Sequence, residues 1–515
     1  MTRSRLLLLV AAVSGAVFAL AAPPTNLYPV LWLGMAGLAW TLHEDVTGAR
    51  LRRWLPGALR GLLFGAAANV VALRFVPDVI ARFTPLPWAA GLLALVLLGF
   101  YQGLRFAAGA VLTMHLQRRG VPRFLAFGLG ILLSTFVPVV FPWSAAGGVT
   151  PWPVMVQLAD VIGERGVTLL MALAAGLLAE AVRLFRADRP RAAKLAALAV
   201  ALPLLTALHG ALRMASVDDR MAHAPHARVS LVQPMTEASE RWDAIRSERI
   251  VTTLTELTRN AERGAPDLVV WPEGAYPYAL AESSRSDLEG VYSILQPGVR
   301  GPVLAGVMMR ARAGGEYNSV VLVDHGRLSP PYHKMHLLAF GEAVPFGDTF
   351  PWLKKTFAKS GGIVPGQAQR TFTVGPVRAA VLVCFEDNLP EAGREAAAMN
   401  PNLLVNVTND AWFFGSAEGE LHLRLAALRS VEHRRDLVRA VNRGPTSWVD
   451  AAGRIRARWP AELAGSLETE PALLEGRTIY GRFGDAPVVL LSALAVLALM
   501  LRERLRHKTE RAPGL

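Results

Sequence analysis

The sequence predicts a multi-span α-helical membrane protein that carries an α/β domain outside the membrane. Three observations lead to this fold class. Charged residues make up only 18% of the 515 residues, against about 25% in soluble globular proteins, and 52% are hydrophobic. Most of the long apolar runs lie in the first 212 residues. From about residue 227 the pattern changes to short β-branched runs separated by charged helical stretches, which is typical of an α/β domain.

Eight apolar runs are long enough, at roughly 20 residues or slightly fewer, to cross a bilayer. They cover residues 6–22, 27–42, 61–81, 85–103, 124–143, 166–182, 195–212 and 486–501. Arg74 and Asp78 interrupt the third run, so its bounds are the least certain of the eight. We therefore expect a seven-helix transmembrane region over residues 1–212, a domain over 213–485, and a C-terminal transmembrane helix with a basic tail over 486–515.

Lys and Arg gather in alternate loops between these runs. They precede the first run, lie between the second and third, follow the fourth, lie between the sixth and seventh, and follow the last, whereas residues 22–26 and 144–152 contain neither. Because positively charged flanks stay on the cytoplasmic side, both termini are predicted to be cytoplasmic and residues 213–485 to lie on the far side. In a bacterial inner membrane that side is the periplasm.

The first run has a second interpretation, since an Arg-flanked apolar stretch ending in Ala-Leu-Ala-Ala at residues 19–22 also resembles a cleavable signal peptide. Cleavage would leave the rest of the topology unchanged. The net charge of +13 is largely explained by the inner loops, which would face anionic lipid. We therefore expect no nucleic-acid partner, and no phosphate-binding loop of the G-x-x-x-x-G-K-[ST] type occurs.

Within the α/β domain, strands are expected at residues 228–232, 267–271, 302–308, 319–323, 377–383 and 403–407. Helices are expected at residues 242–262, 390–399 and 421–439. At somewhat over 250 residues, the domain is large enough to bury its own core.

Three residues in this domain are candidates for chemistry. Glu273 directly follows an apolar strand, where active-site groups of α/β folds often lie, but it equally fits a solvated turn. Lys334 lies in the mixed stretch 332–337, and it also fits an ordinary surface lysine. Cys384, the single cysteine, ends a buried strand, so it is either core filler or a nucleophile. One cysteine excludes a disulfide scaffold and a multi-cysteine metal site, and a His333/His336 metal pair lacks further ligands nearby.

The order Glu, Lys, Cys, with these surroundings, resembles the catalytic signature of the nitrilase superfamily, whose members use an αββα sandwich. Tyr317-Asn318, Phe340-Gly341-Glu342 and the stretch 406–412 resemble its membrane-bound branch, the apolipoprotein N-acyltransferase family. That family has several spans before an extracytoplasmic nitrilase-like domain and one after it, as the hydropathy here predicts. The resemblance is strongest over residues 229–459.

The resemblance implies an enzyme that moves an acyl chain from a phospholipid to Cys384 and then to a diacylglyceryl-modified apolipoprotein, with no metal and no organic cofactor. Glu273 would be the general base, and Lys334 would lower the cysteine pKa and stabilise the oxyanion. The backbone N–H of Phe385 would be a second oxyanion donor. Glu342 would orient Lys334, and Glu386 would support the site.

Aromatic residues indicate where lipid would reach the site. Residues 346–359 alternate aromatic and basic side chains, Trp352 among them, which is typical of an interfacial lid. Trp412 lies in a Trp-Phe-Phe cluster after the strand beyond the cysteine, and Phe141 and Trp143 flank a proline at the outer end of the fifth run. The alternative is that the lid residues and the Trp412 cluster are ordinary core aromatics.

Two features depart from the family pattern. Phe385 stands where the family commonly has Tyr, and residues 132–140 lack the charged residues that usually precede Phe141. Two other functions remain open from the residues alone. The first is a membrane-tethered amidase in which water resolves the thioester, and the second is a membrane scaffold with an inert outer domain.

Overall fold

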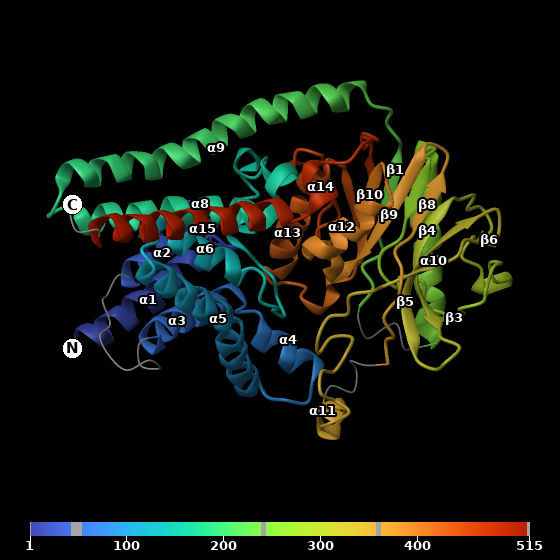
Figure 1. Cartoon of the computed structure of the whole chain (residues 1–515). Helices are drawn as coiled ribbons and strands as arrows, with labels where there is room; N and C mark the ends of the chain where they lie inside the picture. Colours follow the sequence, from blue (N-terminus) through green and yellow to red (C-terminus); the bar gives the residue numbers. More distant parts are fainter. Residues whose placement is uncertain (1, 43–53, 238–243, 357–361, 512–515) are drawn as a thin grey trace. The chain divides into compact units, whose positions relative to one another are not determined.

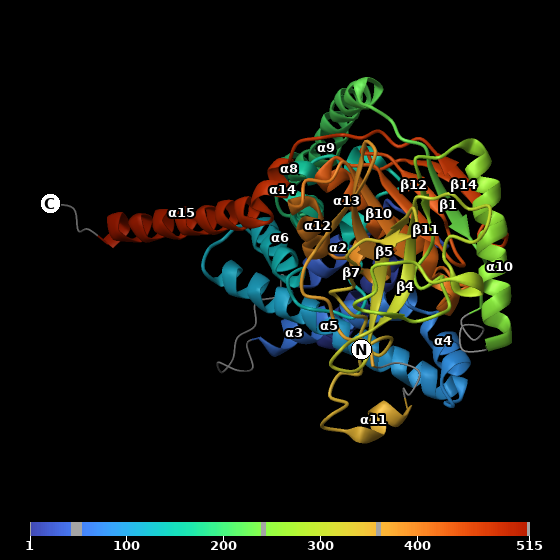
Figure 2. The same ribbon diagram turned by 90° about the vertical axis from the view of Figure 1, so that its right-hand side faces the viewer.

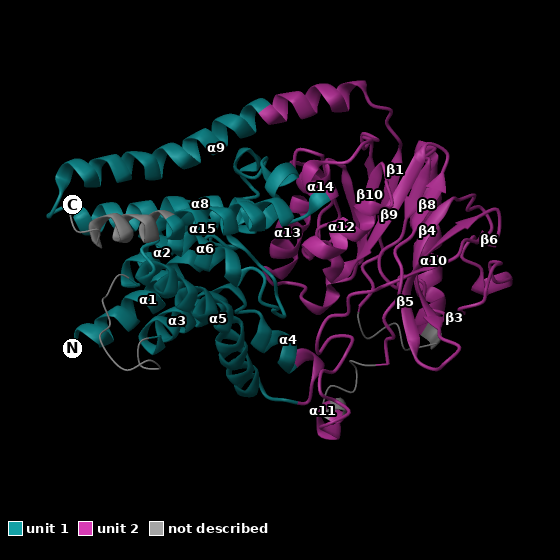
Figure 3. Cartoon of the chain, viewed as in Figure 1, with its two compact units in different colours: residues 1–81, 86–212, 483–515 teal, residues 82–85, 213–482 magenta. Residues whose placement is uncertain are grey.

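The computed structural model describes residues 2–42, 54–237, 244–356 and 362–511, without the side chains of residues 244, 245, 354, 356 and 502–511. These residues form two compact units (Figure 3). Unit 1 comprises residues 1–81, 86–212 and 483–515, and unit 2 comprises residues 82–85 and 213–482. Residues 50–53 of the expected basic loop and Lys359 of the predicted lid lie outside the described residues. The side chains of Lys354 in the lid and of residues 502–508 in the basic tail are also not described.

Unit 1 is helical (Figure 1). Its helices are α1 (Arg3–Ala19), α2 (Val30–Thr41), α3 (Leu55–Ala72), α4 (Val76–Phe83), α5 (Trp88–Arg118), α6 (Arg123–Ser134), α7 (Ala145–Gly148), α8 (Ala159–Leu184), α9 (Arg189–His223) and α15 (Ala486–Arg511). The last residues of α4, from residue 82, and of α9, from residue 213, belong to unit 2. By length and composition, α3, α5, α8 and α9 are able to cross a membrane. Three shorter apolar helical segments are α2, α6 and Ala486–Leu501.

Two predicted runs extend about nine residues past the ends of their helices. The run predicted at 61–81 is wrong, because α3 ends at Ala72, before Arg74, and the separate helix α4 contains Asp78. The run predicted at 124–143 is also too long, since α6 ends at Ser134. Pro138 and Pro142 follow in irregular backbone. Proline lacks the N–H that a continuing helix needs, which explains the early end.

Unit 2 contains two mixed sheets. The first has the order β14-β1-β2-β4-β5-β6, with β3 beside β4 and β7 beside β5. Its strands are β1 (Val229–Gln233), β2 (Leu268–Val270), β3 (Leu280–Ala281), β4 (Val303–Arg310), β5 (Glu316–Asp324), β6 (Arg327–Leu328), β7 (Tyr332–His333) and β14 (Gly465–Thr469). The second has the order β13-β12-β11-β10-β9-β8. Its strands are β8 (Thr371–Val374), β9 (Val377–Val383), β10 (Leu403–Thr408), β11 (Leu437–Val441), β12 (Ser447–Val449) and β13 (Ile455–Arg458).

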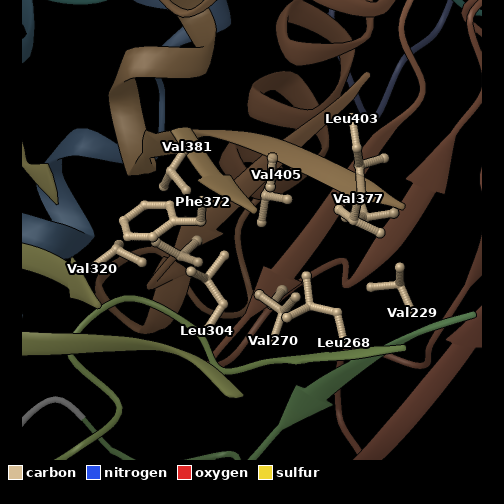
Figure 4. Close-up of a cluster of buried hydrophobic side chains, with 14 of the residues drawn as sticks. Val229, Leu268, Val270, Leu304, Val320, Phe372, Val377, Val381, Leu403 and Val405 are labelled. Carbon is tan, nitrogen blue, oxygen red and sulfur yellow. The ribbon is translucent and has the colours of Figure 1, made fainter. Parts of the chain in front are cut away.

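The main hydrophobic core lies between the two sheets. Val270 and Leu304 of the first sheet face Val381 and Val405 of the second (Figure 4). A second cluster packs α10 (Ala244–Ala261) on the outer face of the first sheet, and a third packs α12 (Pro390–Ala398) and α13 (Glu418–His433) on the second. Figure 2 shows these helices on opposite sides of the paired sheets.

The central strands of both sheets run parallel to their neighbours. β1, β2 and β4 form one parallel set, and β9, β10 and β11 form the other. In such sheets the loops after the carboxyl ends meet at one edge, which is where polar catalytic groups are usually placed.

The six predicted strands are present, but one predicted helix is too long. The helix expected at 421–439 ends at His433, and Arg434 has a φ of 51°. The buried strand β11 then begins at Leu437 and contains Arg439. Eight strands of the structure have no counterpart in the predicted set: β3, β6, β7, β8 and β11 to β14.

Candidate active site

Glu273 lies in the turn that leaves the carboxyl end of β2. The preceding Trp271 is fully buried and donates a hydrogen bond from Nε1 to Thr258 Oγ1 of α10 at 2.8 Å. The turn crosses Gly306 of β4 so closely that a Cβ there would lie 2.1 Å from the Pro272 carbonyl oxygen. Glycine at position 306 therefore allows the Glu273 turn to lie against the sheet.

Lys334 follows β7 and is 1% exposed. Its Nζ lies 2.7 Å from Glu342 Oε2 and 3.6 Å from Glu273 Oε1. The Asn318 Nδ2 atom of β5 donates to Glu273 Oε1 at 2.6 Å and to Glu342 Oε1 at 3.0 Å. One ammonium and one amide therefore hold both carboxylates in place.

These contacts determine the charges of Lys334 and Glu342. Burial lowers the pKa of Lys334, but the negative charges of Glu342, Cys384 as thiolate and Glu273 outweigh burial and raise it. Burial raises the pKa of Glu342, but Lys334 and the hydrogen bond from the Leu338 N–H bring it below its usual value. Both groups are therefore ionised at neutral pH.

Cys384 directly follows β9 and begins a short 3₁₀ turn, Cys384–Asn388. Its φ is 50°, a value that non-glycine residues seldom adopt, and its side chain is half-buried. Burial and the charge of Glu273 raise the thiol pKa well above its usual range, whereas Lys334 lowers it by less. The thiol is therefore neutral at rest, so the expected lowering by Lys334 does not suffice to ionise it, and a base is required.

Glu386 connects the cysteine turn to the lysine segment. It is fully buried, and its carboxylate accepts hydrogen bonds from the backbone N–H groups of Val383, Met335 and His336. The Tyr332 hydroxyl donates to both of its oxygens, at 2.9 and 2.8 Å. Glu386 thus connects the segment after β7, which contains Lys334, to the turn that contains Cys384, and the half-buried Phe385 lies beside it.

The histidines of the H-x-x-H stretch have separate partners. His333 Nδ1 lies 2.7 Å from Ser319 Oγ, and its ring stacks on Tyr317 at 4.0 Å between centroids. His336 Nε2 lies 2.9 Å from Glu395 Oε2. The two rings therefore have different partners, with Ser319 and Tyr317 beside His333 and Glu395 beside His336.

The candidate lipid-access residues differ in exposure. Trp352 on α11 (Pro351–Thr356) is 62% exposed, and Phe346 before it is 74% exposed. Trp412 packs on Phe83, with ring centroids 4.4 Å apart, and both residues belong to unit 2. The exposed aromatics of 346–352 are therefore surface residues rather than core residues.

Phe141 and Trp143 lie in unit 1, in the irregular segment after α6. Trp143 is 1% exposed, and its Nε1 donates to Asn69 Oδ1 at 3.2 Å. Gln102 Oε1 accepts from the Phe141 N–H, and Arg105 donates to the Trp143 carbonyl. A buried polar network of the helices thus holds this segment, which hydropathy alone did not indicate.

Two sequence profiles match the chain. The first, described as the apolipoprotein N-acyltransferase N-terminal domain, matches residues 14–177, and the second, described as carbon-nitrogen hydrolase, matches residues 228–467. A curated protein of Geobacter metallireducens named apolipoprotein N-acyltransferase is 31% identical over 97% of this chain and 96% of its own length. The chain belongs to the apolipoprotein N-acyltransferase family. A relative of the same name from Bradyrhizobium diazoefficiens is 31% identical over 97% of this chain and 95% of its own length.

Among solved structures, a mutant of the amidase from Nesterenkonia sp. AN1 is 19% identical, with a TM-score of 0.39 over 52% of this chain and 96% of the amidase. The carbon-nitrogen hydrolase region of the family contains Glu273, Lys334, Glu342, Cys384 and Glu386. The N-terminal region of the family contains Phe141 and Trp143. Asn318 belongs to the Tyr317-Asn318 motif, but the sequence assigns it no role, although its Nδ2 atom donates to both carboxylates.

Proposed function

We propose that this chain transfers an acyl chain from a phospholipid to Cys384, and from there to the N-terminal α-amino group of a diacylglyceryl-modified bacterial apolipoprotein. Family membership over nearly the whole chain supports N-acyl transfer to lipoproteins. The observation that carries the proposal is the buried Lys334, which lies 2.7 Å from Glu342 and 3.6 Å from Glu273 and acts electrostatically on the only cysteine.

In the first half-reaction, Glu273 takes the proton of the Cys384 thiol as the sulfur attacks the ester carbonyl of the phospholipid. The base is needed because the thiol pKa is raised. Lys334 and the Phe385 N–H stabilise the negative oxygen of the tetrahedral intermediate. Collapse breaks the ester C–O bond, Glu273 returns the proton to the departing alkoxide, and the products are a thioester and a lysophospholipid.

In the second half-reaction, the α-amino group of the apolipoprotein attacks the thioester carbonyl. Glu273 accepts a proton from the attacking nitrogen, and the same two donors hold the oxyanion. The C–S bond breaks, the proton passes to the sulfur, and an amide forms. The thiol of Cys384 is regenerated, so the cycle is a ping-pong exchange with no metal or organic cofactor.

Glu342 and Asn318 act on Lys334 and Glu273 rather than on the reacting atoms. Glu342 balances Lys334, so the buried ammonium stays protonated. Asn318 aims the Glu273 carboxylate by a 2.6 Å hydrogen bond. Both are positioning residues in this proposal.

We further propose that residues 1–212 and 486–515 form eight spans of the bacterial inner membrane, with both termini cytoplasmic and the catalytic domain of 213–485 periplasmic. The apolar helices α3, α5, α8 and α9, together with three shorter apolar segments, support a membrane protein. The distribution of Lys and Arg supports the orientation. Trp352, Trp412, Phe141 and Trp143 are the proposed lipid-access residues.

Intact mass spectrometry of the full chain after incubation with a defined phospholipid tests the reaction. Wild type is expected to gain the mass of one acyl chain in a hydroxylamine-labile form, and Cys384→Ala is expected to gain none. Addition of a diacylated lipopeptide should remove the adduct and acylate the peptide. Rapid loss of the adduct to free fatty acid, with an unmodified peptide, would favour the amidase. No adduct in wild type would contradict the proposal and favour a scaffold.

A further inference from the structure

A buried group of charged residues lies behind the cysteine turn. His422 of α13 is buried, and its Nε2 lies 2.7 Å from Asp387 Oδ1 and 3.3 Å from the backbone carbonyl oxygen of Cys384. Its Nδ1 lies 3.3 Å from Asp410 Oδ1. Arg439 Nη1 of β11 lies 3.3 Å from Asp387 Oδ2. Alternating charges therefore lead from Arg439 through Asp387 and His422 to the peptide of the nucleophile.

The contacts indicate that His422 is an imidazolium. Burial lowers its pKa, but the carboxylates of Asp387 and Asp410 raise it to about 10. Burial and the Asp410 charge raise the pKa of Glu418 to about 8, which keeps that acid neutral at neutral pH. The two cations His422 and Arg439 then balance the two aspartates.

The same group is not well suited to a metal ion. Ligand atoms of Asp410, Glu418 and His422 lie within 4.8 Å of one another. Both ring nitrogens of His422 already face carboxylate or carbonyl oxygens, as an imidazolium requires. A bound cation would add charge to a balanced group, so the geometry favours a role in hydrogen bonding.

The hydrogen bonds act on the peptide that joins Cys384 to Phe385. Its carbonyl oxygen accepts from Asn406 Nδ2 at 3.2 Å and faces His422 Nε2 at 3.3 Å. A peptide unit is planar and trans, so the Phe385 N–H points away from that carbonyl. Cys384 also has a φ of 50°, which needs support from its surroundings. Holding the carbonyl therefore sets the direction of the Phe385 N–H.

We propose that His422 is a positioning residue for acyl transfer, which orients and polarises the Cys384–Phe385 peptide so that the Phe385 N–H donates to the oxyanion. This inference rests on the proposed function. The positive charge of His422 beside the Cys384 carbonyl draws electron density from the peptide and strengthens the Phe385 N–H as a donor. His422 itself contacts the carbonyl on the side opposite to that N–H.

The test compares two reactions of Cys384 in the full chain with His422→Gln. Acylation by a defined phospholipid passes through an oxyanion, whereas alkylation by iodoacetamide is a direct displacement that forms none. Cys384 is the only cysteine, so intact mass reports both rates without ambiguity. We expect acylation to slow about tenfold to hundredfold, since a full oxyanion donor contributes about 10²–10³. The alkylation rate is expected to stay within about twofold of wild type, and the pH at which it is half-maximal should not change, because alkylation does not need the Phe385 N–H.

His433→Gln is the matched control. His433 is buried on the same helix, 11 residues or about 16 Å further along, and both rates should match wild type. Should His422→Gln fail to fold, Asn406→Ser weakens the hold on the same carbonyl and is expected to give the same divergence of the two rates.

Four results would overturn the inference. Parallel loss of acylation and alkylation in His422→Gln would indicate a general collapse of the site, and unchanged acylation would indicate no role. Stoichiometric metal in elemental analysis of the wild type would indicate a metal centre instead. No acyl adduct in wild type would contradict the proposed function and this inference together, whereas an adduct formed equally fast by wild type and variant would contradict this inference alone.

Discussion

At the scale of single residues, the site depends on charges that water does not solvate. An isolated buried ammonium would lose its proton, but Lys334 keeps it because two carboxylates lie within 3.6 Å. Asn318 in turn donates to both carboxylates, so it fixes the distance between them. The buried acids and the amide are therefore one unit, and loss of any member affects the others.

Replacement of Asn318 by leucine tests this unit. The side chain keeps its size but cannot donate, so the Glu273 carboxylate loses the hydrogen bond that orients it as a base. A hydrogen bond to a charged group is worth about 1.5–3 kcal/mol, which predicts that acylation at neutral pH slows about tenfold to hundredfold. The measurement is the rate of acyl-adduct formation on Cys384.

Asn402→Leu is the control for the Asn318 variant. Asn402 is also buried in unit 2, but it lies at the amino end of β10 and bonds to Arg378 and Pro376. It should change stability without changing the acylation rate of the folded protein. Equal acylation by Asn318→Leu and wild type would show that Glu273 needs no such support.

At the scale of elements, the catalytic candidates are placed by the ends of parallel strands. Glu273 follows β2 and Cys384 follows β9, and the two strands belong to different sheets that pack face to face. Glu386 then ties the β9 turn to the segment after β7. The positions of these turns depend on close backbone contacts. The clearest is the contact between Gly306 of β4 and the Glu273 turn.

Gly306→Ala is expected to displace the Glu273 turn. The added Cβ would lie 2.1 Å from the Pro272 carbonyl oxygen and 2.8 Å from the Glu273 Cα, and both are backbone atoms. We expect a loss of acylation of about a hundredfold, because a shift of about 1 Å in a catalytic group has an effect of this size.

Gly264→Ala provides a matched glycine, since its nearest neighbours are the carboxylate atoms of Glu468, which are free to move aside. That variant should acylate at the wild-type rate, within about 0.5 kcal/mol of wild-type stability. Wild-type acylation by Gly306→Ala would show that the turn adapts and that the close contact has no functional role.

At the scale of the whole molecule, the buried charges predict how stability depends on pH. The pKa values of Asp436, Glu418 and His422 are raised to about 7, 8 and 10, the acids mainly by burial and His422 by its carboxylate partners. In each case the folded state binds the proton more tightly than the unfolded state. Stability therefore falls as pH rises from the pKa of the group in the unfolded state to its pKa in the folded state. The lowered pKa values of Glu342 and Asp410 act in the acid range instead, where stability falls as pH decreases.

The Tm of the full chain should therefore decrease between about pH 6 and pH 9 by about 5 °C or more, since each pKa unit corresponds to 1.36 kcal/mol. Scanning fluorimetry at constant ionic strength measures this slope. Glu418→Gln removes one titrating group and should make the slope shallower. A Tm that is flat or rises over this interval would contradict the assignment of these groups.

Hydropathy and charge along the chain were sufficient to indicate helical segments rich in apolar residues, an α/β region after residue 227 and the candidates Glu273, Lys334 and Cys384. These features are local, because runs of apolar residues and a polar residue at a strand end are visible without knowledge of neighbours. The family follows from motifs of the same kind and from the relatives of similar sequence.

The end of the helix at His433, the role of Asn318, and the group around His422 depended on tertiary contacts. Residues such as Arg439, Asp387 and His422 are charged and appear in sequence as ordinary surface residues, yet they are buried together. Their burial is favourable only because partners from β11, the cysteine turn and α13 meet in space and neutralise one another. No local pattern contains that information, since Asp387, His422 and Arg439 lie at least 17 residues apart in the sequence.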